Sequence, residues 1–325
     1  MNVGGLCIDR TVRDRGPTVV TIGSFDGFHR GHRRLIETAR ECANARGLPL
    51  TLLTFEPLPR EFLVPEEPPA RLTTWGEKVL ESQSAGIDRI VCLRFDQHLA
   101  QIRADDFIQA ILLHGLKAAG IVVGRNFRFG YHREGDLARL ERILTATGHE
   151  LVAADLATAE AGRISSTRIR MALAAGDLDQ AAELLGHPYR MIGRVQHGRQ
   201  RGRLLGYPTA NLAVRRRRCP VGGVYAVRVY GAGPLPYNGV ASLGIRPGLD
   251  DRGELLEVHL FDCSADLYGR RLAVEFIAFL RPERPFSSWD ALQKAIDRDA
   301  GEARAILDQR GHLQREARGR LPKNA

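Results

Sequence analysis

The spacing of apolar residues changes abruptly near position 186, and this change constrains the fold more than any other feature of the chain. Before it, apolar runs rich in β-branched residues alternate with segments of helical period, and after it short apolar runs are separated by Gly and Pro. The first pattern is typical of a parallel α/β sheet and the second of an antiparallel barrel. A chain of 325 residues is long enough for two domains. We expect them over residues 1–185 and 186–325.

The first half is expected to form a Rossmann-like domain with a parallel sheet. Buried strands are predicted at residues 18–24, 48–55, 89–95 and 119–124. Helical periods follow them at 32–46, 74–86, 104–115 and 135–148, and two more helices are predicted at 167–175 and 178–185. Parallel sheets of this kind bind ligands outside the carboxyl ends of their strands. A site is therefore expected where a strand ends and a helix begins.

The second half is expected to form an antiparallel barrel covered by a helix. Six short strands are predicted at residues 191–198, 209–214, 223–230, 238–244, 255–262 and 271–280. Residues 287–309 then combine an N-cap serine with helical spacing. We expect this C-terminal helix to pack on the barrel.

The formal charge of +9 is distributed unequally between the two halves. Up to residue 185 the chain has 23 Lys and Arg against 24 Asp and Glu, a net of −1, and after it 24 against 14, a net of +10. A basic excess favours a partner with negative charge, such as nucleic acid, an anionic membrane or phosphorylated small molecules. The two domains are therefore expected to meet different ligands.

The sequence predicts a cytoplasmic protein without membrane association. Its five cysteines are scattered and form no C-x-x-C pair, which is typical of reduced thiols. Residues 1–16 contain no apolar core of a signal peptide, and the longest stretch free of charged residues, 229–245, is broken by Gly and Pro. The oligomeric state is left open.

The segment G-S-F-D-G-F-H-R-G-H at residues 23–32 predicts a phosphate site directly after the first strand. Its glycines allow a tight backbone, and the helix that follows directs free N–H groups toward the strand end. Two histidines three residues apart can face one phosphate group, although such a pair alone is usually an ordinary surface feature. A zinc site is disfavoured because no third ligand is near. The candidate phosphate-binding residues are Gly23, Phe25, Asp26, His29, Gly31 and His32.

Two later segments of the first half carry further candidates. Asn126 follows the fourth strand in N-F-R-F-G and is a candidate contact for a planar ligand. The segment R-I-S-S-T-R-I-R begins at residue 163 and leads into a helix, where its hydroxyl groups are also expected to cap the helix. Cations and hydroxyls in such a segment suit ATP phosphates. The candidates there are Arg163, Ser166, Thr167 and Arg168.

In the second half, residues 193–212 are rich in Gly and Arg but lack the P-loop pattern. Glycine turns such as those at Gly198 and Gly202 can wrap phosphates through backbone N–H groups. Thr209 and Asn211 are two residues apart on a strand, so they share a face and could serve a Mg²⁺ ion on ATP. Glu257 and His259 share a face of a later strand, which by pattern alone indicates solvent-exposed alternation.

Taken together, these motifs and intervening segments such as R-L-T-T-W-G-E-K resemble bacterial bifunctional riboflavin kinase/FAD synthetases over nearly the whole chain. The resemblance implies that the first domain transfers AMP from ATP to FMN and releases pyrophosphate. It places ATP phosphates at His29 and His32 and the flavin beside Asn126. It also assigns Arg163, Ser166 and Thr167 to the R-I-S-S-T motif of that family.

For the second domain, the resemblance implies ATP-dependent phosphorylation of riboflavin to FMN. The G-x-P-T-A-N motif that binds metal and phosphates falls on Thr209 and Asn211, and the proton acceptor for the ribityl hydroxyl falls on Glu257. The expected ligands are Mg²⁺, ATP, riboflavin, FMN and FAD.

The chain departs from the family pattern at a few positions. In the first domain these are Ser24, Phe28 and Leu58. In the second, Ser242 and Gly248 replace the Asn and Thr common in bacterial members, which leaves flavin preference and regulation open.

Other classes of function explain fewer of these motifs. Another H-x-G-H adenylyltransferase, acting on phosphopantetheine or nicotinamide mononucleotide, or a relative of class I tRNA synthetases would not explain G-Y-P-T-A-N-L. A nucleic-acid-binding protein would use the basic tail and the run Arg215, Arg216, Arg217 and Arg218. Four arginines are shorter than a usual basic binding motif, so we expect no nucleic-acid partner.

Overall fold

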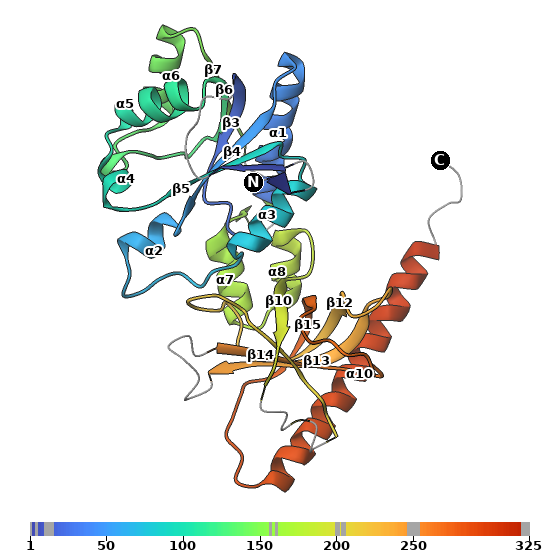
Figure 1. Ribbon diagram of the computed structural model, residues 1–325. Coiled ribbons are helices and arrows are strands. Elements are labelled where there is room, and N and C mark those ends of the chain that lie inside the picture. Colours follow the sequence, from blue (N-terminus) through green and yellow to red (C-terminus); the bar gives the residue numbers. More distant parts are fainter. Residues whose placement is uncertain are drawn as a thin grey trace. The chain divides into compact units, whose positions relative to one another are not determined.

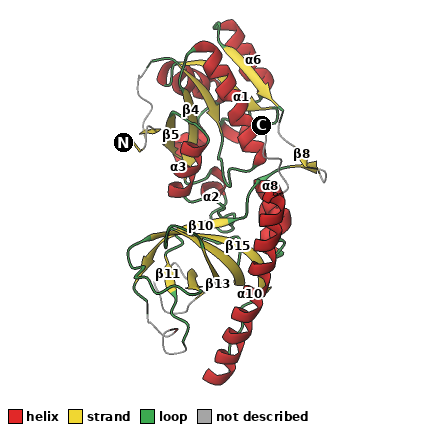
Figure 2. Cartoon of the chain, turned by 90° about the vertical axis from the view of Figure 1, so that its right-hand side faces the viewer, coloured by secondary structure: helices red, strands yellow, loops and turns green. Residues whose placement is uncertain are grey.

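The computed structural model describes residues 2–3, 6–9, 16–155, 158–159, 162–198, 202, 206–245 and 254–319. The chain divides into two compact units, Met1–Ser166 and Thr167–Ala325 (Figure 1). The first contains a 7-stranded sheet and the second a closed antiparallel barrel followed by a long helix (Figure 2). The fold class expected from the sequence is therefore confirmed.

The sheet of the first unit has the strand order β1-β2-β5-β4-β3-β6-β7. The strands are β1 (Asn2–Val3), β2 (Leu6–Asp9), β3 (Thr18–Ile22), β4 (Leu50–Glu56), β5 (Arg89–Arg94), β6 (Ala118–Gly124) and β7 (Glu150–Ala154). From β2 to β7 the neighbours are parallel, whereas β1 pairs with β2 in antiparallel fashion. The chain moves outward from β3 through β4 to β5 and then returns to β6 on the other side of β3. The order of strands thus reverses between β3 and β6, where such sheets bind ligands.

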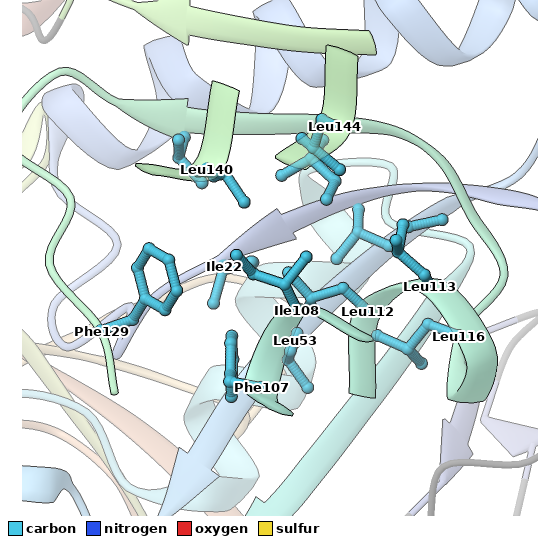
Figure 3. Close-up of a cluster of buried hydrophobic side chains, with 14 of the residues drawn as sticks. Ile22, Leu53, Phe107, Ile108, Leu112, Leu113, Leu116, Phe129, Leu140 and Leu144 are labelled. Carbon is cyan, nitrogen blue, oxygen red and sulfur yellow. The ribbon is translucent and has the colours of Figure 1, made fainter. Parts of the chain in front are cut away.

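Helices pack against both faces of this sheet. The first unit contains the helices α1 (Arg30–Arg46), α2 (Pro59–Leu63), α3 (Trp75–Ser84), α4 (Gln97–Gln101), α5 (Ala104–Asp106), the π-helix η1 (Phe107–Gly115), the 3-10 helix η2 (Tyr131–Arg133) and α6 (Leu137–Ala146). Adjacent residues of β3 face different cores: Val19 packs with α1 and α3, and Val20 with η1 and α6. Figure 3 shows the second core, with Ile22 and Leu53 among its labelled side chains.

The barrel of the second unit closes in the order β10-β11-β14-β13-β12-β15. Its strands are β10 (Arg190–Gln196), β11 (Ala210–Leu212), β12 (Gly223–Tyr230), β13 (Tyr237–Ile245), β14 (Glu254–Leu260) and β15 (Arg271–Arg281). Each neighbouring pair, including β10 with β15, is antiparallel. All six strands predicted from the sequence are found close to their expected positions.

Helix α10 (Trp289–Gly319) covers the barrel. Ala303 and Leu307 of this helix lie in one apolar cluster with Val224 of β12. A buried ion pair adds a polar contact, because Arg281 Nη2 lies 2.7 Å from Asp299 Oδ2. The predicted C-terminal helix is confirmed and extends beyond its expected end.

The two helices before the barrel, α7 (Ser166–Ala174) and α8 (Leu178–Leu185), fall almost entirely within the second unit. A Cβ atom on Gly176, between them, would lie 3.2 Å from the ring of Phe279 on β15, so this connection packs on the barrel. The first domain predicted from the sequence, residues 1–185, includes both of these helices. The boundary after Leu185 therefore stays a prediction. A short hairpin, β8 (Thr158–Ala159) and β9 (Gly162–Arg163), precedes them.

Candidate active sites

The loop after β3 is a tight, buried turn. Gly23 N donates to Leu53 O at 3.1 Å, which continues the sheet contact beyond β3. Phe25, Gly27 and Phe28 then have φ values of 46°, 94° and 42°, in the left-handed region that non-glycine residues seldom occupy. Both phenylalanine rings are fully buried and lie 5.7 Å apart. The loop is therefore held against the core by its aromatic side chains.

Asp26 anchors this loop to the segment that precedes α3. Its side chain is 2% exposed and accepts hydrogen bonds from Leu72 N at 3.3 Å and Thr73 N at 2.9 Å. In the other direction, Gly27 N donates to Thr73 Oγ1 at 2.5 Å. We therefore assign Asp26 a positioning role. The phosphate contact expected from the sequence stays a prediction.

His29 and His32 form a stacked pair at the beginning of α1. Their ring centroids are 3.6 Å apart with an interplanar angle of 13°. His29 is the N-cap residue, and its Nδ1 accepts the His32 N–H at 3.2 Å. A neutral His29 ring must then carry its proton on Nε2, where it can donate to a ligand. The two candidates of the H-x-G-H motif are thus brought together at the switch point of the sheet.

The electrostatics of the pair favour a neutral His32. Burial, followed by the proximity of His29 and of Lys78, holds the pKa of His32 well below its ordinary value of 6.5. Its Nδ1 is buried and makes no hydrogen bond within the parts of the chain that the structure describes.

Gly31 allows the close approach of His29. A Cβ atom at this position would lie 3.2 Å from both Nδ1 and Cε1 of the His29 ring, and 3.8 Å from Ile164 O. The contact with Ile164 also shows that the R-I-S-S-T segment lies beside the start of α1. Ser166 Oγ completes this contact by donating to Asp26 O at 2.8 Å.

The remaining candidates that the sequence predicted for the first site lie on other elements, and Thr167 and Arg168 belong to the second unit. Arg163 is exposed on β9, and Thr167 and Arg168 lie in the first turn of α7. Asn126 is exposed in the turn after β6, the strand that pairs with β3. Phe127 next to it stacks on Phe129 with centroids 5.2 Å apart, and both rings belong to the core. Asn126 thus lies at the carboxyl edge of the sheet, as expected.

In the second unit, the strand register brings two candidate side chains, Asn211 and Glu257, into one row with Ser242. Asn211 of β11 is directly opposite Glu257 of β14, and Glu257 is directly opposite Ser242 of β13. Directly opposed residues in antiparallel strands have their Cβ atoms about 4.5–5.5 Å apart. The carboxylate of Glu257 is thus flanked by an amide and a hydroxyl.

The glycine-rich segment lies against the two candidate metal ligands. A Cβ atom on Gly198 would lie 2.0 Å from Asn211 Nδ2. One on Gly202 would lie 2.3 Å from Tyr207 O and 3.3 Å from Thr209 Oγ1. A side chain at Gly202 would overlap the backbone at Tyr207 O, and one at Gly198 would have to displace the side chain of Asn211.

Of the two departures in the barrel, Ser242 has a clear contact and Gly248 lies outside the described residues. Ser242 Oγ donates to Glu283 Oε1 at 2.6 Å, in the segment between β15 and α10. The Ser242 hydroxyl, on the residue opposite Glu257, is therefore hydrogen-bonded to a second carboxylate, that of Glu283.

A buried polar network that was not predicted from the sequence lies beside the first site. Lys78 of α3 is 0% exposed, and its Nζ lies 3.3 Å from Thr54 Oγ1 and 3.3 Å from Glu56 Oε1. The pattern that could have revealed it is the helical stripe of Trp75, Lys78 and Val79, in which a lysine takes a position typical of an apolar residue.

Known proteins resemble this chain over both of its halves. The FAD synthetase family model matches residues 11–168 and the riboflavin kinase family model matches residues 185–307. The chain belongs to the family of bifunctional riboflavin kinase/FMN adenylyltransferases. A member from Escherichia coli (strain K12) is 43% identical over 289 residues, which cover 89% of this chain and 92% of the relative. One from Pseudomonas fluorescens is 44% identical over 295 residues, 90% of this chain and 94% of the relative. The expected riboflavin kinase and FAD synthetase activities are confirmed.

A solved structure described as a macrolide-efflux protein from Streptococcus pneumoniae is also similar. Its TM-score is 0.75 at 31% identity, and the match covers 91% of this chain and 97% of that one. No helix in the described part of this chain has the length and apolar content needed to cross a membrane.

Proposed function

We propose that each activity of this flavin-forming enzyme uses the residues assembled in one unit. In the second unit, Glu257 removes the proton from the ribityl hydroxyl of riboflavin, and the resulting oxygen attacks the γ-phosphorus of ATP as ADP leaves. The observation that supports this assignment is the row of Asn211, Glu257 and Ser242 across three strands. It places a carboxylate beside the candidate ligands of the nucleotide, as general-base catalysis requires.

The residues present fit a Mg²⁺ ion in this unit. Thr209 and Asn211 offer a hydroxyl and an amide oxygen, which are the hard oxygen ligands that Mg²⁺ accepts beside phosphate and water. Gly198 and Gly202 themselves contribute no side chain next to Asn211 and Thr209, so their backbone can approach a bound phosphate. When bound, the ion would neutralise charge on the ATP phosphates. Thr209 and Asn211 would hold it, and the glycine-rich backbone would orient the phosphates.

In the first unit, we propose that the stacked histidines stabilise the triphosphate while the phosphate of FMN attacks the α-phosphorus of ATP and pyrophosphate leaves. The stacking of His29 on His32 at the N-terminus of α1 carries this assignment. Neutral rings and helix N–H groups donate hydrogen bonds to developing negative charge. Asn126 is assigned to the flavin, and the proposed further contacts of ATP within this unit are Gly23, Phe25, Gly31, Arg163 and Ser166. Thr167 and Arg168 belong to the second unit, and their expected contact with ATP stays a prediction.

Two substitutions in the full-length protein separate these assignments. With riboflavin, ATP and Mg²⁺, Glu257→Ala is expected to form no FMN but to convert supplied FMN to FAD. His29→Ala is expected to form FMN and to stop there. Chromatographic separation of the flavins measures both. Loss of both steps in either variant, or retention of the targeted step, contradicts the residue assignments.

The basic tract in the barrel gives little support to a nucleic-acid partner. Arg216 is only 3% exposed, and its Nη1 donates to Val214 O at 3.1 Å. The tract is therefore not a continuous exposed basic surface. The absence of a nucleic-acid partner and the cytoplasmic location stay predictions.

A further inference from the structure

Lys78 is a fully buried cation near the adenylyl-transfer site, and the functions assigned above do not use it. Its side chain is 0% exposed on α3, facing the sheet beside Val79. Lysine is among the residues least often fully buried, because removing an ammonium group from water is costly unless it is paired. An apolar side chain would fill this position of the helix at lower cost.

The ammonium group is connected to the loop after β3 by one hydroxyl. Lys78 Nζ donates to Thr54 Oγ1 at 3.3 Å, and Thr54 Oγ1 donates to Ser24 O at 3.4 Å. Both hydrogen bonds can form at once, because the Thr54 hydroxyl accepts a hydrogen from Lys78 and donates its own to Ser24 O. A change at Lys78 can therefore reach the loop that ends in His29.

The same network also reaches the segment that binds Asp26, on the loop after β3. Glu56 Oε1 accepts from Lys78, whereas its Oε2 accepts from Arg71 Nη1 at 2.7 Å. Arg71 Nε also donates to Glu61 Oε1 at 2.8 Å, and Arg71 directly precedes the residues that bind Asp26. Glu56 thus keeps a cationic partner even when Lys78 is neutralised. The need to pair Glu56 is therefore not enough to explain why Lys78 is buried.

We propose that Lys78 is a positioning residue for adenylyl transfer, which fixes the loop through Thr54 and Ser24 and supplies positive charge behind the ATP phosphates. This inference rests on the proposed ATP site at His29 and His32. Fixed charge in a weakly polar interior acts over longer distances than in water and needs no direct contact. The lowered pKa of His32, to which burial contributes most, then His29 and then Lys78, is consistent with a field that reaches the histidine pair.

Two variants of the full-length protein test this role. Lys78→Met removes the charge and keeps the length of the side chain, and Thr54→Val removes the hydroxyl link and keeps the charge. FAD formation from supplied FMN is measured while ATP and FMN are varied separately. Lys78→Met is expected to raise KM for ATP by about tenfold or more and to change KM for FMN by less than about twofold. Thr54→Val is expected to raise KM for ATP by about threefold.

Riboflavin kinase activity of the same chain is the internal control, and it is expected to be unchanged in both variants. A purely structural role predicts a lower melting temperature with both KM values altered alike, and that result overturns the proposal, as does an unchanged KM for ATP. If Lys78→Met fails to fold, Thr54→Val alone decides by the same criterion. Should the unmodified protein form no FAD, the proposed function fails. If it forms FAD and the variants match it, only the role of Lys78 fails.

Discussion

Gly31→Ala should separate the stability of helix α1 from the geometry of the histidine pair. Gly31 is the second residue of the helix, and its φ lies outside the left-handed region, so alanine fits its backbone. Replacing glycine by alanine within a helix stabilises it by up to about 1 kcal/mol. By helix propensity alone, the variant should be as stable as the unmodified protein or slightly more stable.

The new methyl group nevertheless meets the ring of His29. Its Cβ would lie 3.2 Å from Nδ1 and Cε1, closer than the ordinary contact range of 3.4–4 Å. The His29 ring must then shift by a few tenths of an ångström. The shift disturbs its stacking on the His32 ring, whose centroid is 3.6 Å away, and its hydrogen bond of 3.2 Å from His32 N. Small misplacements of catalytic groups are costly, so we expect kcat/KM for adenylyl transfer to fall by about tenfold or more.

Gly76→Ala is a matched control, because Gly76 is also the second residue of a helix in the same unit and nothing lies within 4 Å of its added Cβ. Both variants are assayed for FMN adenylylation and for urea denaturation. The unfolding free energy should change by no more than about 1 kcal/mol in either. Adenylyl transfer by Gly31→Ala within about twofold of Gly76→Ala would refute the idea that this contact positions His29.

Two other predictions concern the barrel and the pH dependence of the first unit. Gly198→Ala places a Cβ atom 2.0 Å from Asn211 Nδ2. Riboflavin kinase activity should therefore fall by about tenfold or more, while FMN adenylylation is kept. Gly222→Ala is the control, because the nearest neighbour of its added Cβ lies 3.9 Å away. In the folded unit the pKa of His32 is held well below 6.5. As the pH falls below 6.5, His32 therefore becomes protonated in the unfolded chain while it stays neutral in the folded unit. The unit should lose stability over this range, and His32→Gln should reduce the slope of the urea midpoint against pH. Equal slopes would contradict the assignment.

Much of the fold could be predicted because its information is local. The strands β3 to β6 are runs of buried β-branched and leucine residues, and α1 carries its apolar residues at helical spacing, so both are visible in short windows of sequence. Strand β7, Glu150–Ala154, was missed because it is a short edge strand whose residues are mostly half-buried. Its place depends on pairing with β6, which no local pattern indicates.

The sequence by itself determined the two fold types, the family and the identity of the candidate residues, because glycine turns, strand and helix periods and motif spacing are properties of neighbouring residues. Only the tertiary structure decided that Asp26 holds the loop, that Asn211, Glu257 and Ser242 form one row, and that Lys78 is buried. Register and burial arise from contacts between segments far apart in the chain. A lysine in a helical segment of sequence does not show whether its side chain faces water or, as Lys78 does, the end of a strand.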